Sequence, residues 1–272
     1  MFRLIDRYFI KKPLIRRFVT KLLAGARERE VTLLAGDYVV HTVMEHGLFR
    51  ASRLARTCSL FRDELPVLIH LAGLLRDGDT FLDIGANVGV FAAHIAGFRV
   101  LFPGLRVYAF EPNPDTAARL RANAERLGVE IFDVALSDRN GTLESVDGAV
   151  SNVFSTVENA SSYSITGEHR VCECRRLEDL AIQGHSLVMK IDVKGHEWEV
   201  LQGAVGLFQA NRVRALYLDD FKDARIVTFL DNYEFRFFNG RTLKPASDRT
   251  RHLLAIKGSG AGSTPQKNQL KS

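Results

Sequence analysis

A short glycine-bearing loop follows a strand-like segment in the first half of the chain. The run Thr80–Ile84 is apolar except for Asp83 and leads directly into Gly85–Gly89, with the sequence GANVG. Small residues at the carboxyl end of a strand let a bound ligand approach the backbone, as in nucleotide-binding α/β proteins. The loop departs from the dinucleotide pattern G-x-G-x-x-G, because Asn87 stands where the second glycine is required. Asp83 would also repel a pyrophosphate, whereas it suits a cation or an amino group.

An acidic residue ends the next strand-like segment, about twenty residues further on. Glu111 follows Arg106–Phe110 directly and precedes Pro112 and Asn113. A carboxylate at this position can accept hydrogen bonds from both hydroxyls of a ribose. The alternative is that Glu111 only interacts with the start of the following helix. The loop and the acid together favour a ribosyl ligand without a bound diphosphate, and S-adenosylmethionine has that chemistry.

Five blocks of sequence carry a resemblance to a known family. In chain order they are FLDIGANVGVFAAHIA, YAFEPNP, FDVALSDRNGTLE, CRRLEDL and MKIDVKGHEWEVLQGA. Their order and spacing, over roughly residues 60–257, resemble the FkbM family of S-adenosylmethionine-dependent methyltransferases. The resemblance implies the class I methyltransferase fold, a Rossmann-like, doubly wound sheet of seven strands with an antiparallel last strand. It also implies methylation of a hydroxyl oxygen on a small molecule or a sugar.

The same resemblance implies roles for individual residues. It places four residues of the strand and loop at the methionine end of the cofactor: Asp83, Gly85, Asn87 and Gly89. It gives the ribose to Glu111 and the two sides of the adenine to Asp133 and Ala135. Asp192, after a later strand, would lie where the methyl group meets the acceptor.

The loop after this later strand carries the candidate catalytic residues Asp192, Lys194 and His196. Methyl transfer needs the acceptor and the methyl group held in line, and a general base adds a factor of roughly a hundred or more. Asp192 and His196 are the candidate bases, although a histidine at a helix start can be purely structural. Lys194 departs from the family, which commonly has an acidic residue there, so the departure indicates a different acceptor or a less active enzyme.

Three arrangements would accommodate an ammonium group close to the sulfonium of the cofactor. Lys194 or Lys190 pairs with Asp192, an acceptor brings its own carboxylate or phosphate, or Lys194 points into solvent. Of these we favour the anionic acceptor.

Strand-like and helix-like segments alternate from Thr80 onward, which predicts an α/β fold with a largely parallel sheet. Seven segments have the composition of strands, and they are listed here in chain order: Thr80–Ile84, Arg106–Phe110, Glu130–Ala135, Leu187–Asp192, Val213–Leu218, Phe235–Phe238 and His252–Lys257. Residues 145–170 are rich in Ser, Asn and Thr, and we expect a long loop there that is either disordered or a lid.

The remaining chain divides into an extension and a tail. We expect residues 1–60 to form a basic, amphipathic helical extension, residues 61–257 the methyltransferase domain, and residues 258–272 a disordered tail. Residues 1–30 carry a net charge of +6, whereas the rest of the chain carries −1. The first thirty residues therefore either cover the domain with their apolar stripe or lie on an anionic membrane.

Composition excludes several classes of protein. The longest stretch without Asp, Glu, Lys or Arg, Ile84–Phe98, is too short to cross a bilayer. Three cysteines, Cys58, Cys172 and Cys174, do not make a secreted disulfide framework, so we expect a cytoplasmic protein with peripheral membrane contact as an alternative. No spacing of Cys or His indicates a metal site. Beyond residue 30 no basic stripe with interleaved aromatics indicates nucleic acid as a partner.

Two other functions stay open beside methyl transfer to a small molecule or sugar. A nicotinamide-dependent oxidoreductase uses the same class of fold, but its glycine pattern is missing. A non-catalytic module that binds the cofactor or a membrane would account for Lys194 and for the basic extension.

Overall fold

The computed structural model describes residues 13–34, 36–54, 60–148, 154–156, 167–246 and 251–258. The helix expected for the first twelve residues lies outside this part of the chain, as does all but the first residue of the expected tail. Within these ranges no helix is both long enough and apolar enough to cross a membrane.

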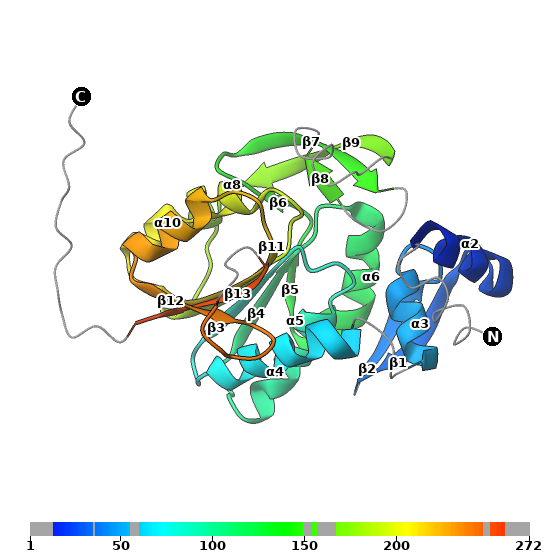
Figure 1. The fold of residues 1–272 in the computed structure, drawn as a ribbon, viewed down its shortest axis with the longest axis horizontal. Coiled ribbons are helices and arrows are strands. Elements are labelled where there is room, and N and C mark those ends of the chain that lie inside the picture. The colour runs from blue at the N-terminus through cyan, green and yellow to red at the C-terminus, as the bar shows by residue number, and fades with distance from the viewer. Residues whose placement is uncertain are drawn as a thin grey trace.

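A seven-stranded sheet forms the centre of the molecule (Figure 1). Its spatial order is β12-β13-β11-β10-β3-β4-β5, and the strands from β11 to β5 are parallel neighbours. β13 runs antiparallel between β11 and β12. The bounds in chain order are β3 Thr80–Ile84, β4 Arg106–Phe110, β5 Glu130–Phe132, β10 Leu187–Ile191, β11 Val213–Asp220, β12 Phe235–Asn239 and β13 Arg251–Lys257. This order confirms the predicted α/β, doubly wound class I methyltransferase fold, including the antiparallel last strand.

Helices cover both faces of this sheet. The first face packs against α4 (Leu65–Leu74), α5 (Val90–Gly97) and α6 (Pro114–Ala124), and the second against α8 (Glu197–Gln202), α9 (Val205–Gln209) and α10 (Arg225–Asn232). Successive side chains of a strand point to opposite faces. Phe81 and Val107 accordingly belong to the first core, whereas Leu82 and Tyr108 belong to the second. Single helical turns complete the described helices: η1 Leu60–Glu64, η2 Phe98–Val100, η3 Glu125–Leu127 and η5 Leu177–Asp179.

Strand order reverses between β3 and β10, and this reversal fixes where a ligand binds. From β3 the chain proceeds through β4 to β5 on one side, and later through β10 to β11 on the other. Ile84 is level with Ile191 in β10 and with Phe110 in β4. The loops after these three strands therefore begin side by side at the carboxyl edge of the sheet, where open α/β sheets bind their ligands.

A second, four-stranded sheet contains the whole described part of the expected long loop. It has the order β6-β9-β7-β8, with β6 Ala135–Leu136, β7 Gly141–Gly148, β8 Phe154–Thr156 and β9 Gly167–Arg175. The prediction of an irregular loop over 145–170 was therefore wrong for its two ends and for β8. β-branched residues such as Thr and Val form strands readily, and pairing with β9 satisfies the backbone of β7. The expected strand Glu130–Ala135 is split between the two sheets.

The N-terminal unit contains strands where a helical pattern was expected. α2 (Pro13–Ala24) and α3 (His46–Leu54) are helices, but an antiparallel hairpin of β1 (Glu28–Leu33) and β2 (Gly36–His41) lies between them. Val31 and Leu33 are buried in β1, and Tyr38 and Val40 in β2. Burial at every second residue is the strand period. Short apolar runs of this kind do not distinguish strand from helix on their own.

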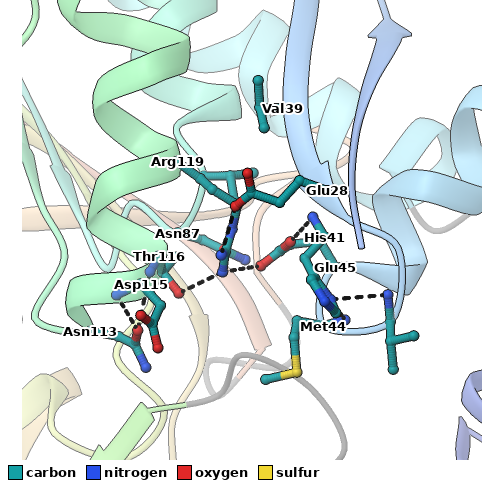
Figure 2. A network of polar contacts seen from close by, with 12 residues as sticks. Glu28, Val39, His41, Met44, Glu45, Asn87, Asn113, Asp115, Thr116 and Arg119 are labelled. Atoms are coloured by element: carbon teal, nitrogen blue, oxygen red, sulfur yellow. Dashed lines mark hydrogen bonds and ion pairs between the residues drawn. The ribbon is translucent and has the colours of Figure 1, made fainter. Parts of the chain in front are cut away.

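Polar contacts with α6 hold this unit against the domain (Figure 2). The buried Arg119 guanidinium lies 2.9 Å from the Glu45 carboxylate and 3.6 Å from that of Glu28. The Asn123 side chain accepts a hydrogen bond from the Val39 amide and donates one to the Val39 carbonyl. The extension is thus docked through its hairpin. In α2, by contrast, Phe18 and Leu22 are 67% and 74% exposed, so the apolar stripe of this helix is only partly covered.

Candidate active site

A cavity of about 460 Å³ opens at the carboxyl edge of the central sheet. Its walls come from the loops after β3, β4 and β10, from Tyr217 and Asp219 of β11 and from Val134–Leu136. Met44–Leu48, at the start of α3, close it on the side of the N-terminal unit. The predicted site residues that line it are Gly85, Asn87, Glu111, Ala135, Asp192, Lys194 and His196. Asp83, Gly89 and Asp133 are not among the lining residues.

Asp83 does not line the cavity but holds the loop after β3 in place through buried contacts. Its side chain is fully buried, and the Lys190 ammonium lies 2.9 Å from Oδ1 while the Ala92 amide donates to Oδ2. Lys190 also donates to the Gly85 carbonyl at 3.0 Å. A buried carboxylate needs such partners. Asp83 and Lys190 thereby tie β3, the loop and β10 together, which is a positioning role.

The two glycines of the loop have different surroundings. Gly85 has φ +74°, and a Cβ there would lie 2.2 Å from the Asp192 carbonyl oxygen. Only glycine therefore lets the loops after β3 and β10 approach this closely. Gly89 has φ +86°, and a Cβ there would meet Leu120 of α6 at 2.5 Å. Gly89 thus serves the packing of α6, whereas Gly85 lies at the cavity.

Glu111 lines the cavity with both carboxylate oxygens held by backbone amides. Asn87 N donates to Oε2 and Asn113 N to Oε1, each at 3.0 Å. The side chain is buried, and this burial raises the pKa of Glu111 to about 7 despite the two amide donors. Each oxygen keeps a lone pair for a further donor. Two adjacent hydroxyls, as on a ribose, would fit this arrangement.

The part of the cavity beside β6 is apolar, whereas the family resemblance placed the acid Asp133 there. Val134, Ala135 and Leu136 line it together with Phe110, whose ring stacks on Phe132 with centroids 5.2 Å apart. The Asp133 carboxylate instead lies 2.7 Å from Arg121 of α6 and is 44% exposed. Apolar walls suit the faces of a purine ring.

Lys194 does not point into solvent. Its ammonium lies 2.5 Å from the Asp192 carboxylate and 3.3 Å from that of Asp219, which comes from β11. Burial alone would raise the pKa of Asp192, but Lys194 and Lys190 outweigh it and hold the pKa below its usual value. Of the three arrangements considered above, the structure therefore has the pairing of Lys194 with Asp192.

His196 lies at the start of α8 with its ring already engaged. Nε2 is 3.0 Å from Ser137 Oγ, and Nδ1 is 3.4 Å from Glu199 Oε2. The side chain is buried, and burial lowers the pKa of His196 to about 4. The imidazole is neutral at pH 7 and weakly basic.

Comparison with known proteins agrees with this geometry. The family model described as the methyltransferase FkbM domain matches residues 83–237, which is more than half of the chain. The chain belongs to the FkbM family. The match begins at Asp83 and includes the loops that carry Glu111 and Asp192.

Three curated FkbM-family relatives match parts of the chain. The hexuronic acid methyltransferase AglP of Haloferax volcanii is 30% identical over 55% of this chain and 59% of its own length. The 2-O-methyltransferase NoeI of Sinorhizobium fredii is 29% identical over 57% of this chain and 69% of its own. The 31-O-demethyl-FK506 methyltransferase FkbM of Streptomyces tacrolimicus is 44% identical over 25% of each chain. The chain therefore spans about three fifths of AglP and a quarter of FkbM.

Solved structures of methyltransferases are also similar. An O-methyltransferase from Thermotoga maritima gives a TM-score of 0.40 at 14% identity, with 86% of this chain and 79% of that chain covered. A TehB-like methyltransferase from Corynebacterium glutamicum gives a TM-score of 0.42 at 10% identity, with 78% and 96% covered.

Several residues of the cavity lie outside the segment that matches the FkbM model. Met44–Leu48, Glu64 and His252 line the cavity and lie outside this segment. Tyr217 also lines the cavity and lies inside the segment. The Tyr217 hydroxyl donates to the Asp219 carboxylate at 3.0 Å and lies 2.9 Å from His252 Nδ1. Asp219 was not among the residues predicted for the site. Residues before β3 carry no motif, so no signal in the sequence indicated Met44–Leu48 or Glu64.

Proposed function

We propose that this chain transfers a methyl group from S-adenosylmethionine to a hydroxyl oxygen of a sugar or small molecule. The observation that carries the proposal is Glu111. It is a buried carboxylate at the cavity whose oxygens each retain an acceptor position, next to a loop that Gly85 opens to a ligand. Membership of the FkbM family supports the same activity.

The residues present fit the cofactor. Glu111 would hold the two ribose hydroxyls, and Val134–Leu136 with Phe110 would contact the adenine. The buried Asn87 Oδ1 has no hydrogen-bond partner in the part of the chain that the structure describes. Buried polar atoms are nearly always paired, so this oxygen is suited to the amino group at the methionine end. When bound, S-adenosylmethionine supplies the electrophilic methyl group.

Charge at the other end of the cavity favours a neutral hydroxyl acceptor over an anionic one. Glu64, Asp192 and Asp219 bring three carboxyl groups there, whereas Lys194 brings one ammonium that is already paired. Lys190 is neutralised by Asp83. Like charges in a buried site repel. The name of AglP states a hexuronic acid, so acidic sugars remain the second acceptor class to test.

Calorimetric titration with four adenosine-containing ligands tests the proposal against a nicotinamide oxidoreductase. We expect S-adenosylmethionine and S-adenosylhomocysteine to bind, and NAD and NADP not to bind. Acceptors are then screened with methyl-labelled cofactor, using neutral methyl glycosides and methyl glycuronosides side by side. Cofactor binding without turnover of any acceptor would favour the non-catalytic module, and binding of NAD alone would refute the proposal.

A further inference from the structure

The carboxyl group of Glu64 lines the acceptor end of the cavity and forms no hydrogen bond or ion pair with the other described residues of the site. Glu64 is the last residue of η1, directly before α4 in the chain, and it lines the cavity. It is half-buried, and within the described chain no hydrogen bond or ion pair reaches it. Carboxyl groups removed from water are normally paired. Its partner is therefore expected to be a molecule bound in the cavity.

The two bases suggested by the sequence are poorly suited to take a proton. Asp192 is bound to Lys194 at 2.5 Å, and an ammonium so close opposes protonation of the carboxylate. His196 contacts Ser137 through Nε2, and its buried ring disfavours the imidazolium. Proton acceptance at either residue would break an existing contact or charge a buried ring. Glu64 has neither obstacle.

We propose that Glu64 faces the acceptor hydroxyl and accepts its proton during methyl transfer. This inference rests on the proposed function. The acceptor oxygen forms its bond to the methyl carbon, the bond from that carbon to sulfur breaks, and its electron pair returns to sulfur. The hydroxyl proton passes to the Glu64 carboxylate, which releases it to water after the product leaves. Atoms and charge balance without a further reactant.

The surroundings of Glu64 raise its pKa to a value suited to accepting a proton near neutral pH. Burial, and then the charge of Asp192, raise the pKa of Glu64 to about 7, and Asp219 acts in the same direction. The ammonium groups of Lys190 and Lys194 oppose the rise without cancelling it. A base whose pKa lies near the working pH is the most effective proton acceptor. The other titratable groups that line the cavity are Glu45, His46, Asp63, Glu111, His196, Tyr217 and His252.

A binding experiment tests the location of Glu64 without any acceptor. S-adenosylmethionine carries a sulfonium, whereas S-adenosylhomocysteine carries a neutral thioether, and both share the ribose and the adenine. An ionised Glu64 near the transferred methyl group favours the cation. We expect the affinity ratio of the two ligands, measured by calorimetry, to shift severalfold toward S-adenosylmethionine between pH 6 and pH 8. Glu64→Gln should abolish this shift.

Glu197→Gln is the matched control. Burial raises the pKa of Glu197 to about 7 as well, but its two oxygens accept hydrogen bonds from the Gly195 amide and it does not line the cavity. This variant should keep the pH-dependent shift. Glutamine at position 64 replaces a half-buried carboxyl group and breaks no hydrogen bond, so the fold should persist, and circular dichroism checks this.

Turnover tests the chemical role, with whichever methyl glycoside proves to be an acceptor. Glu64→Gln should lower kcat at least a hundredfold and remove the rise of kcat/KM with pH near 7, while Glu64→Asp restores part of the rate. A variant that keeps both the affinity shift and the pH-dependent rate would overturn the role of Glu64. Failure of the wild-type protein to bind S-adenosylmethionine would instead refute the proposed function itself.

Discussion

Glu111, which the sequence predicted to contact a ribose, has a carboxyl group whose hydrogen bonds and burial are known only from the structure. Its place after the second strand of the nucleotide-binding half predicted a contact with ribose. The amides of Asn87 and Asn113, which hold the carboxylate in place, follow from the loop geometry. Burial then sets its protonation near neutral pH, and burial is a tertiary property that no local pattern reports.

Cofactor affinity should depend on pH through Glu111. A protonated carboxyl group loses one acceptor position, so binding should weaken as the pH falls below about 7, where the raised pKa places protonation. Titration with S-adenosylhomocysteine between pH 6 and pH 8 measures this, since its neutral sulfur is insensitive to Glu64. Glu111→Gln should lower affinity at least tenfold at pH 8, because a hydrogen bond to a charged group contributes about 1.5–3 kcal/mol. A variant with wild-type affinity would contradict the contact with ribose.

Gly85 should be the glycine of the loop that tolerates substitution least. In Gly85→Ala the Cβ would lie 2.2 Å from the backbone oxygen of Asp192, in a left-handed conformation that costs about 1–2 kcal/mol by itself. Backbone cannot yield as a flexible side chain does, so both thermal stability and cofactor affinity should fall. Gly97→Ala is the control, since nothing lies within 4 Å of a Cβ there and its φ is ordinary. Its stability should change by less than about 1 kcal/mol. Equal melting temperatures for the two variants would refute the close approach of the loops.

At the scale of elements, the strands that follow strong patterns were predicted well. Thr80–Ile84 and Arg106–Phe110 are β3 and β4 to the residue. The helix α6 begins as its sequence predicts, with Asn113 accepting from the amides of Asp115 and Thr116 and Pro114 in the first turn. The hairpin β1–β2 was missed because its short apolar runs do not distinguish strand from helix. The sheet of β6 to β9 pairs segments that lie far apart in the chain, and a local pattern does not identify such partners.

Asn123 should be the residue that couples the hairpin to the cofactor loop. Its side chain bonds both backbone groups of Val39 in β2 and donates to the Val88 carbonyl at 2.9 Å. Asn123→Ala leaves these groups without partners, and each unpaired buried group costs about 1–3 kcal/mol. Chemical denaturation should therefore show a loss of at least about 2 kcal/mol. Calorimetry should show weaker cofactor binding.

Asn232→Ala provides the comparison, because this residue is exposed at the end of α10. Its stability should stay within about 0.5 kcal/mol of the wild type. If Asn123→Ala behaved in the same way, the hairpin would not depend on this contact.

At the scale of the whole molecule, the N-terminal segment of residues 1–30 has both a high positive charge and exposed apolar side chains. Residues 1–30 carry a net charge of +6 in a chain of net charge +5. Within the described part of that segment, α2 exposes Phe18 and Leu22, one helical turn apart. The stripe therefore does not serve only to cover the domain. Basic residues beside exposed apolar side chains are typical of helices that lie on anionic membranes.

Vesicle sedimentation should reveal this contact. We expect the protein to bind phosphatidylserine-containing vesicles at low salt, to dissociate as salt screens the basic residues, and to ignore phosphatidylcholine vesicles. Replacing Phe18 and Leu22 together by Ser should abolish binding, because these are the most exposed apolar side chains of α2. The matched control replaces Val100 and Leu101 by Ser. These side chains are 88% and 66% exposed but lie outside the basic segment, so vesicle binding should persist. Binding that withstands high salt, or that both double variants lose equally, would exclude an electrostatic membrane contact through α2 and leave its exposed face to another partner.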